Sequence, residues 1–212
     1  MTEYSDYTAN ENTTEHAPIG RVLRASTVGF VCGTRSEEIV YPSFGAFVYT
    51  QHARYTDGLI VVGLIHAISI DDDPLVRQMV MANNTNHNAV QDQRVNRMVP
   101  VEISTAHVGF SQHDRVYHNL PPRPPLSLDE VFLCDDAMVE RFTQEFTFLR
   151  LVLNTTEVPT EQLLAAALNH ACAARPRSAQ RDFLVRAGRE LAGMLGHDLP
   201  RLHHLLKLIR PV

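Results

Sequence analysis

Residues 58–70 read Gly-Leu-Ile-Val-Val-Gly-Leu-Ile-His-Ala-Ile-Ser-Ile and are the most apolar stretch of this 212-residue chain. The stretch has 13 residues between Asp57 and Asp71, whereas a membrane-spanning helix needs about 20. Its β-branched residues instead predict one long strand, which bends at Gly63 or is covered on both faces.

Similar short runs lie on both sides of this strand. We expect strands over residues 20–26, 27–32, 45–50, 99–110 and 115–120, because each run is rich in β-branched or aromatic residues. The early runs are too close together for parallel crossovers, so they predict an antiparallel meander or barrel of about six strands. Residues 71–98 are expected to interrupt this barrel with a short helix, capped by Asp73, and a polar loop.

The C-terminal part of the chain has helical spacing. Apolar side chains recur every three or four residues, which predicts about four helices over residues 138–153, 159–174, 178–196 and 198–211. The expected fold class is therefore α+β, with a small antiparallel β-barrel over residues 18–120 and a C-terminal helical bundle over residues 137–212.

The remaining segments are predicted to be irregular. Residues 1–17 have little apolar surface and are expected to form a disordered tail. Residues 121–136 begin with Pro-Pro-Arg-Pro-Pro, which predicts a stiff connector that leaves the barrel. The alternative use of such a polyproline run is as a ligand for an aromatic groove.

Charge is distributed unevenly along the chain. Residues 1–136 contain 9 basic and 17 acidic side chains, whereas residues 137–212 contain 10 basic and 7 acidic ones. This pattern excludes a uniformly basic surface for nucleic acid but allows a basic face on the helical half. The candidates for contact with nucleic acid or an acidic partner are Arg175, Arg177, Arg181, Arg186 and Arg189. The alternative is an ordinary solvated face around a leucine core.

No catalytic motif is found. A phosphate loop ends in Gly-Lys-Ser or Gly-Lys-Thr, but the only lysine, Lys207, precedes Leu208. The aspartates of residues 71–73 lack the spacing of a calcium loop, and the 11 histidines include no His-x-x-x-His pair of a zinc enzyme. We therefore expect no enzyme activity, no cofactor and no metal site.

Cysteine usage and the N-terminus indicate the compartment. Cys32, Cys134 and Cys172 are far apart, which predicts free thiols in a reducing environment. The N-terminus lacks the basic start and apolar core of a signal peptide. A cytoplasmic location without a membrane segment is the expectation.

Three stretches of the β-rich half share a pattern with a known family: Ile19-Gly20-Arg21-Val22, Phe44-Gly45-Ala46-Phe47-Val48 and residues 59–65, with Gly20, Gly45, Phe47 and Gly63 as the motif positions. They resemble the HAS barrel, which is found at the N-terminus of HerA-type DNA translocases and of ring-forming ATP synthase subunits. The resemblance covers residues 18–70 and extends to 99–120. Unlike a HerA translocase, the chain does not continue into an ATPase domain, and its helices resemble no family.

The resemblance implies a binding role, because the barrel packs against neighbouring proteins in those ring assemblies. The expected function is a non-enzymatic adaptor that docks on a HerA-like ATPase or its associated nuclease during DNA processing, with oligomerisation left open. One alternative is a barrel that binds nucleic acid directly through the arginine-rich helical face. Another is an enzyme whose centre is built from histidines, which requires several of them to share one pocket.

Overall fold

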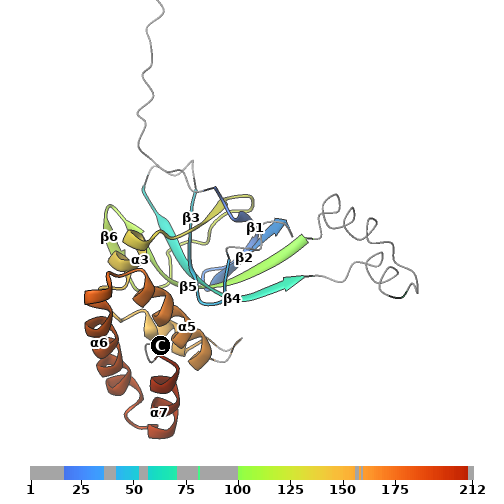
Figure 1. The fold of residues 1–212 in the computed structure, drawn as a ribbon. Coiled ribbons are helices and arrows are strands. Elements are labelled where there is room, and N and C mark those ends of the chain that lie inside the picture. Colours follow the sequence, from blue (N-terminus) through green and yellow to red (C-terminus); the bar gives the residue numbers. More distant parts are fainter. Residues whose placement is uncertain are drawn as a thin grey trace, which may run out of the picture.

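The computed structural model describes residues 17–35, 42–52, 57–70, 81, 100–155, 158 and 160–209. Seven strands within these residues form one antiparallel sheet, and helices follow it in the chain. Figure 1 shows the sheet curled into a barrel, with the long C-terminal helices packed together on one side of it. The predicted α+β class is confirmed.

The sheet closes on itself through six of its strands. Its order is β2-β1-β7-β3-β4-β5-β6, and a further pairing of β2 with β5 closes the ring, so that β6 extends β5 only as a short hairpin. The bounds are β1 Gly20–Ala25, β2 Gly29–Arg35, β3 Phe47–Gln51, β4 Ile60–Ile70, β5 Pro100–Gln112, β6 Arg115–Tyr117 and β7 Glu130–Leu133. The prediction of a barrel of about six strands is confirmed, and closure leaves the six strands without a free edge.

The sixth barrel strand is a different segment from the one that the sequence predicts. Residues 121–136 were expected to be a connector, but Val131 in their middle is fully buried and pairs with Gly20 of β1 and Thr50 of β3. Strand β7 therefore belongs to the barrel, and the predicted barrel boundary at Leu120 is wrong. The expected strand over residues 115–120 forms the hairpin strand β6, whose turn at His113 and Asp114 has positive φ at both residues, as a two-residue hairpin requires.

Three β-bulges bend the barrel and redirect side chains. The pairing registers skip Leu23 in β1, His66 in β4 and Val108 in β5. A bulged residue leaves the regular inside-outside alternation of its strand. In β1 both Leu23 and Arg24 lie on the surface, whereas His66 in β4 and Val108 in β5 are buried.

Among the residues that the structure describes, five helices follow the barrel: α3 Asp136–Phe142, α4 Leu149–Leu153, α5 Thr160–Ala173, α6 Arg177–Leu195 and α7 Leu199–Leu208. Asp135 and Asp198 cap α3 and α7, with side chains that accept from the backbone N–H of Met138 and Arg201. The prediction of a single helix over residues 138–153 is wrong. Helix α3 ends before Thr143, whose hydroxyl donates to the Val139 carbonyl at 2.7 Å, and α4 begins after Phe148.

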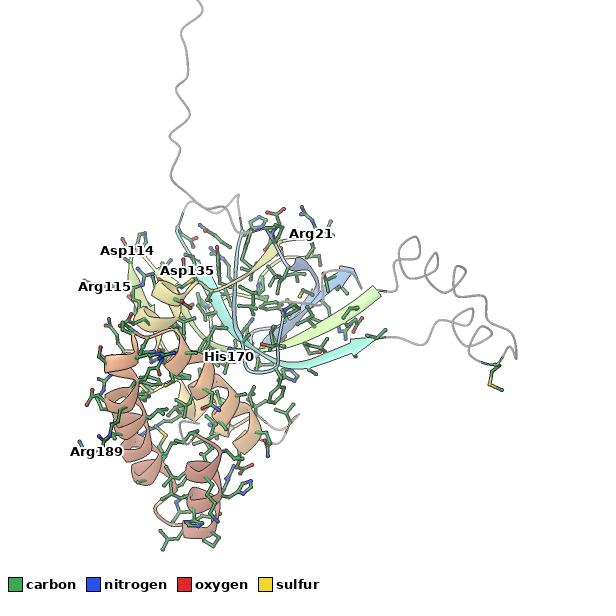
Figure 2. All side chains as sticks on the ribbon, in the orientation of Figure 1. Arg21, Asp114, Arg115, Asp135, His170 and Arg189 are labelled. Atoms are coloured by element: carbon green, nitrogen blue, oxygen red, sulfur yellow. The ribbon has the colours of Figure 1, made fainter. Side chains whose placement is uncertain are left out.

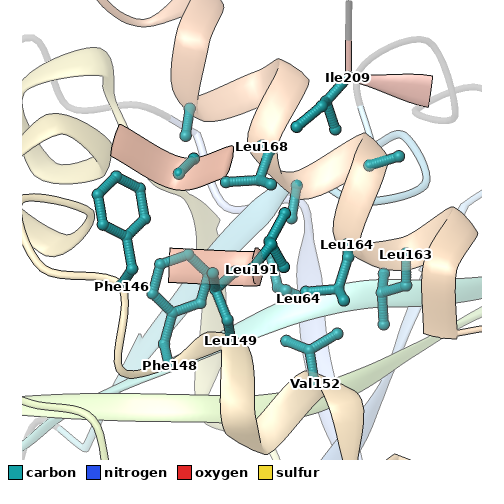
Figure 3. Packing of buried hydrophobic residues seen from close by; sticks show 14 of the residues in the cluster. Leu64, Phe146, Phe148, Leu149, Val152, Leu163, Leu164, Leu168, Leu191 and Ile209 are labelled. Atoms are coloured by element: carbon teal, nitrogen blue, oxygen red, sulfur yellow. The ribbon is translucent and has the colours of Figure 1, made fainter. Parts of the chain in front are cut away.

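The main hydrophobic core lies between the barrel and the helices (Figure 3). Phe47, Leu64 and Val108 of the barrel pack in one cluster with Phe148, Leu149, Val152, Leu164, Leu168 and Leu191 of the helical half. The barrel interior holds a smaller cluster that includes Val22, Phe30, Val48, Ile65 and Ile103. Because the two halves share the larger core, we expect them to unfold together.

Some predictions fall outside the described residues. These are the disordered tail as far as residue 16, the end of the last helix beyond Ile209, and the inserted helix and loop apart from Met81. Among the described helices, none combines the length and hydropathy that crossing a bilayer requires.

Candidate functional site

The barrel motif positions are structural. Gly45 has φ +81°, and a Cβ at this position would lie 2.4 Å from the Cβ of Ala166 on α5. Phe47 packs edge-on against Phe142 and Phe148, with ring centroids 6.0 Å apart in both pairs. Both motif residues therefore attach the barrel to the helices.

The other two motif glycines allow strands to approach closely. A Cβ on Gly20 would lie 2.4 Å from the carbonyl oxygen of Gly33, and one on Gly63 would lie 3.2 Å from that of Ala106. These positions close the barrel and do not present a surface to a partner.

Arg175 belongs to the interior, in contrast to its predicted place on a basic face. Its side chain is 6% exposed, and the guanidinium stacks 3.9 Å from the ring centroid of Phe183. It donates to the carbonyls of Ala171, Glu140 and Thr143 and to the Thr143 hydroxyl. Arg175 therefore ties the end of α5 to α3 and cannot reach a partner.

The other four predicted arginines are exposed on α6 but do not share one face. With about 100° of rotation per residue, Arg177 and Arg181 lie about 40° apart, and Arg186 lies about 180° from Arg177. Figure 2 shows Arg189 pointing away from the barrel. The four arginines are spread over about half of the circumference of α6. The other half carries the buried residues of this helix.

Two of these arginines line a groove beside the loop that connects α3 to α4. Arg186 and Arg189 border a cavity of about 450 Å³ together with Arg150 of α4. Glu145 and Glu190 line the same cavity, and Arg186 also pairs with Asp182 at 3.5 Å. The groove is therefore of mixed charge, which weakens it as a site for a phosphate chain.

The strained position on the barrel surface is Leu128. Its φ is +72°, in the left-handed region that residues other than glycine rarely adopt. The Leu128 N–H donates to the Val22 carbonyl at 2.8 Å, and the Val22 N–H donates to the Asp129 carbonyl at 2.9 Å. Leu128 and Asp129 thus oppose one residue of β1 in a bulge whose first position is usually glycine.

Leu128 is one of three exposed leucines in this part of the barrel. We call Leu23, Leu126 and Leu128 the leucine corner; they are 47%, 40% and 67% exposed. Leu23 is the bulged residue of β1 and follows Val22, to which Leu128 is bonded. The β1 side of the corner, marked by Arg21 in Figure 2, faces away from α6 and α7.

Polar contacts hold the leucine corner in place from behind. The buried Asp129 carboxylate accepts from the Leu126 N–H at 2.8 Å and lies 2.5 Å from Nδ1 of His52. Arg21 donates to the Leu128 carbonyl at 3.1 Å and pairs with Glu130 at 2.5 Å. The three exposed leucines are therefore carried by a backbone that hydrogen bonds hold in place. No sequence motif marks it, except that a leucine stands where the turn favours glycine.

A larger cavity of about 700 Å³ lies where the barrel meets α4, and we call it the seam cleft. Phe30 of β2, His66 of β4 and His107 of β5 line it from the barrel, and Leu151 of α4 lines it from the helical half. The seam cleft brings together five parts of the chain: the β1–β2 hairpin, β4, β5, Leu120, and α4 with the residues that follow it.

The histidines are otherwise scattered. His118 donates from Nε2 to the Phe142 carbonyl at 2.9 Å, and burial lowers its pKa. His197, His203 and His204 are exposed near α7. Within the described part of the chain, no three His, Cys, Asp or Glu side chains are grouped as metal ligands would be.

The cysteines are free thiols in the structure. Burial raises the pKa of Cys32 to about 12 and also raises the pKa of Cys134 and Cys172, so none of them is an activated thiolate.

No protein-family model matches the chain, and no curated protein is similar enough in sequence to place it in a family.

Proposed function

We propose that this protein is a non-enzymatic adaptor or assembly protein whose barrel docks on a HerA-like ATPase, or on the nuclease associated with one, in a DNA-processing machine. The leucine corner is the observation that carries the proposal. It presents three apolar side chains to solvent from a backbone that is both strained and fixed by hydrogen bonds.

The strain at Leu128 is the first reason to assign a binding role to this corner. A leucine in the left-handed region costs roughly 1–2 kcal/mol relative to its usual conformations. The side chain is 67% exposed, so packing within the chain offsets little of that cost. Strained residues of this kind are concentrated at binding and catalytic positions.

The fixed backbone is the second reason. Apolar residues that are already held in place lose little conformational entropy when a partner covers them. Arg21 and Arg24 border the corner and are held by Glu130 and Glu102 at 2.5 and 2.9 Å. Apolar anchors inside a polar, hydrogen-bonded rim are the usual arrangement of a protein-binding hot spot.

The resemblance of the β-rich half to the HAS barrel is the reason for proposing this class of partner. A closed six-strand barrel with the motif glycines at its tight contacts is compatible with that family. A barrel without free edges binds other proteins through its outer face and loops, and the leucine corner combines Leu23 of β1 with two residues of the loop before β7.

Affinity purification of the tagged chain from its host tests this proposal. We expect a HerA-like ATPase or a nuclease to be enriched with the wild-type chain and lost with Leu128→Asp. Recovery of neither protein class, or equal recovery with both baits, would contradict the proposal.

Direct nucleic-acid binding is the second candidate and has less support from the geometry. The arginines proposed for it are divided between the interior and different sides of α6. If it is correct, affinity for DNA falls steeply with salt and is lost when Arg177, Arg181 and Arg186 are replaced by Ala. Salt-independent binding, or binding that survives the triple replacement, would eliminate it.

A further inference from the structure

The seam cleft has a size and position typical of a ligand site. Its volume of about 700 Å³ lies within the range of roughly 300–1,000 Å³ found for small-molecule pockets, which often form between structural units. Val28 and Leu120 line the cleft and are both exposed. The entrance is thus apolar, and a ligand that covered these side chains would remove apolar surface from water.

The cleft carries no unbalanced formal charge. Arg24 is the one Arg, Lys, Asp or Glu among the described residues that line it, and its guanidinium is engaged in a two-point pair with Glu102 at 3.1 and 2.9 Å. A phosphate or carboxylate ligand would therefore meet no uncompensated cation here. The lining favours an uncharged ligand.

His107, one of the residues that line the cleft, has a hydrogen-bonding position that no described residue uses. Its Nδ1 lies 2.9 Å from the Thr27 carbonyl, which can only accept, so Nδ1 carries the proton and Nε2 carries a lone pair. Burial lowers the pKa of His107, so the ring is neutral at pH 7. Nε2 is buried and makes no hydrogen bond to any residue that the structure describes.

An acceptor left in this state destabilises the folded protein, and a ligand that donates to it recovers part of that cost. The neighbouring Phe30 ring lies 5.6 Å from the His107 ring, at an interplanar angle of 48°. Two tilted rings beside a buried acceptor favour an aromatic ligand that inserts past the entrance.

We propose that the seam cleft binds an uncharged aromatic group carrying one N–H or O–H donor, as in indole or phenol, with His107 as the acceptor. The group belongs either to a free small molecule or to a Trp or Tyr side chain of a bound protein. This inference is independent of the leucine corner and of the identity of the docking partner.

Fluorescence of indole probes tests the proposal directly, because the chain contains no tryptophan and adds no indole signal of its own. We expect 3-methylindole to bind the full chain with a shift of its emission to shorter wavelength. The analogue 1,3-dimethylindole lacks the N–H donor, and we expect it to bind at least about tenfold more weakly. Equal affinity for the two probes, or no binding of either, would overturn the proposal.

Two serine variants locate the binding site. Ser104 lines the cleft, so Ser104→Leu narrows it and is expected to weaken 3-methylindole binding by about tenfold or more. Ser69→Leu makes the same change further along the β4–β5 ladder, outside the cleft lining, and is expected to leave binding unchanged. Unchanged binding by Ser104→Leu, with its fold verified by circular dichroism, would place the probe elsewhere and refute the assignment.

A tripeptide distinguishes the two sources of the ligand. Acetyl-Ala-Trp-Ala-amide binds more tightly than 3-methylindole if the natural ligand is a side chain of a protein segment, and more weakly if it is an enclosed small molecule. Either order supports the proposal when the serine variants behave as expected. Tripeptide binding that Ser104→Leu leaves unchanged would contradict it.

Discussion

The guanidinium carbon of Arg175 lies 3.9 Å from the centroid of the Phe183 ring, between the end of α5 and the first turns of α6. Its N–H groups donate to oxygens of α3 and of the residue that ends it, among them the Thr143 hydroxyl at 2.7 Å. The positive charge is satisfied by hydrogen bonds to uncharged oxygens and by the ring face.

Replacing Arg175 by Ala is expected to destabilise the protein strongly. The change removes a donor from buried oxygens of Ala171 and Thr143 and opens a cavity over Phe183, which together cost about 3 kcal/mol or more. Replacing the exposed Arg177 is expected to change stability by less than about 0.5 kcal/mol. Urea unfolding of the two variants measures the difference, and similar stabilities would contradict the structural role of Arg175.

Two glycine-to-alanine substitutions are expected to change the stability of the protein in opposite directions. Gly45→Ala places a Cβ 2.4 Å from that of Ala166 at a positive φ, so it pushes the barrel away from α5 and costs more than about 1 kcal/mol. A Cβ at Gly193 on α6 meets no atom within 4 Å, so Gly193→Ala stabilises the helix by up to about 1 kcal/mol. Thermal unfolding compares them, and a neutral Gly45→Ala would show that the contact is absent in solution.

Replacing the strained Leu128 by glycine is expected to affect partner binding without lowering the stability of the fold. Leu128→Gly relieves the left-handed strain, and the gain is partly offset by the entropy of glycine in the unfolded chain. We expect a stability between that of the wild type and about 1 kcal/mol higher, together with weaker partner binding. A variant that lost stability by more than about 1 kcal/mol would show that the leucine side chain serves packing instead.

Stability is expected to fall as the pH is lowered from 7.5 to 5.5. Burial lowers the pKa of His107, and for His118 it outweighs the opposing effects of the Phe142 carbonyl and Glu145. The unfolded chain therefore takes up protons below pH 6.5, before the folded chain does. Each histidine then adds at most about 1.4 kcal/mol per pH unit to the slope of the free energy of unfolding against pH.

His118→Phe tests the source of this slope. The substitution keeps an aromatic ring against Phe142, 4.8 Å away between centroids, but removes the titrating group. The variant is expected to be less stable at pH 7.5 and to depend less on pH than the wild type. A slope equal to that of the wild type would exclude His118 as a contributor.

The sequence predicts the elements that have strong local patterns. The β-branched runs of β1 to β5 and the apolar stripes of α5 to α7 are recognised because burial imposes periods of 2 and 3.6 residues. Strand β7 has only four residues and follows a proline-rich segment. Its burial comes from pairing with β1 and β3, which are distant in the sequence. Nothing local distinguishes it from a connector.

The surfaces depend even more on long-range contacts. Arg175 is one of five similar cations in the sequence, and only its partners on α3 identify it as buried. The seam cleft is assembled from β1, β2, β4, β5, Leu120 and α4, and no short motif marks such a site. The leucine corner is visible only when the φ of Leu128 and its bond to Val22 are known.

The most direct test of the docking role compares two aspartate variants in a binding assay with the purified HerA-like ATPase of the same genome. Leu128 and Leu199 are 67% and 66% exposed, and Leu199 lies at the start of α7, where an aspartate is well tolerated. We predict that Leu128→Asp weakens the complex by at least about tenfold in Kd, while Leu199→Asp leaves it unchanged. Equal affinities for wild type, Leu128→Asp and Leu199→Asp, or no complex with the wild-type chain, would contradict the proposed docking surface.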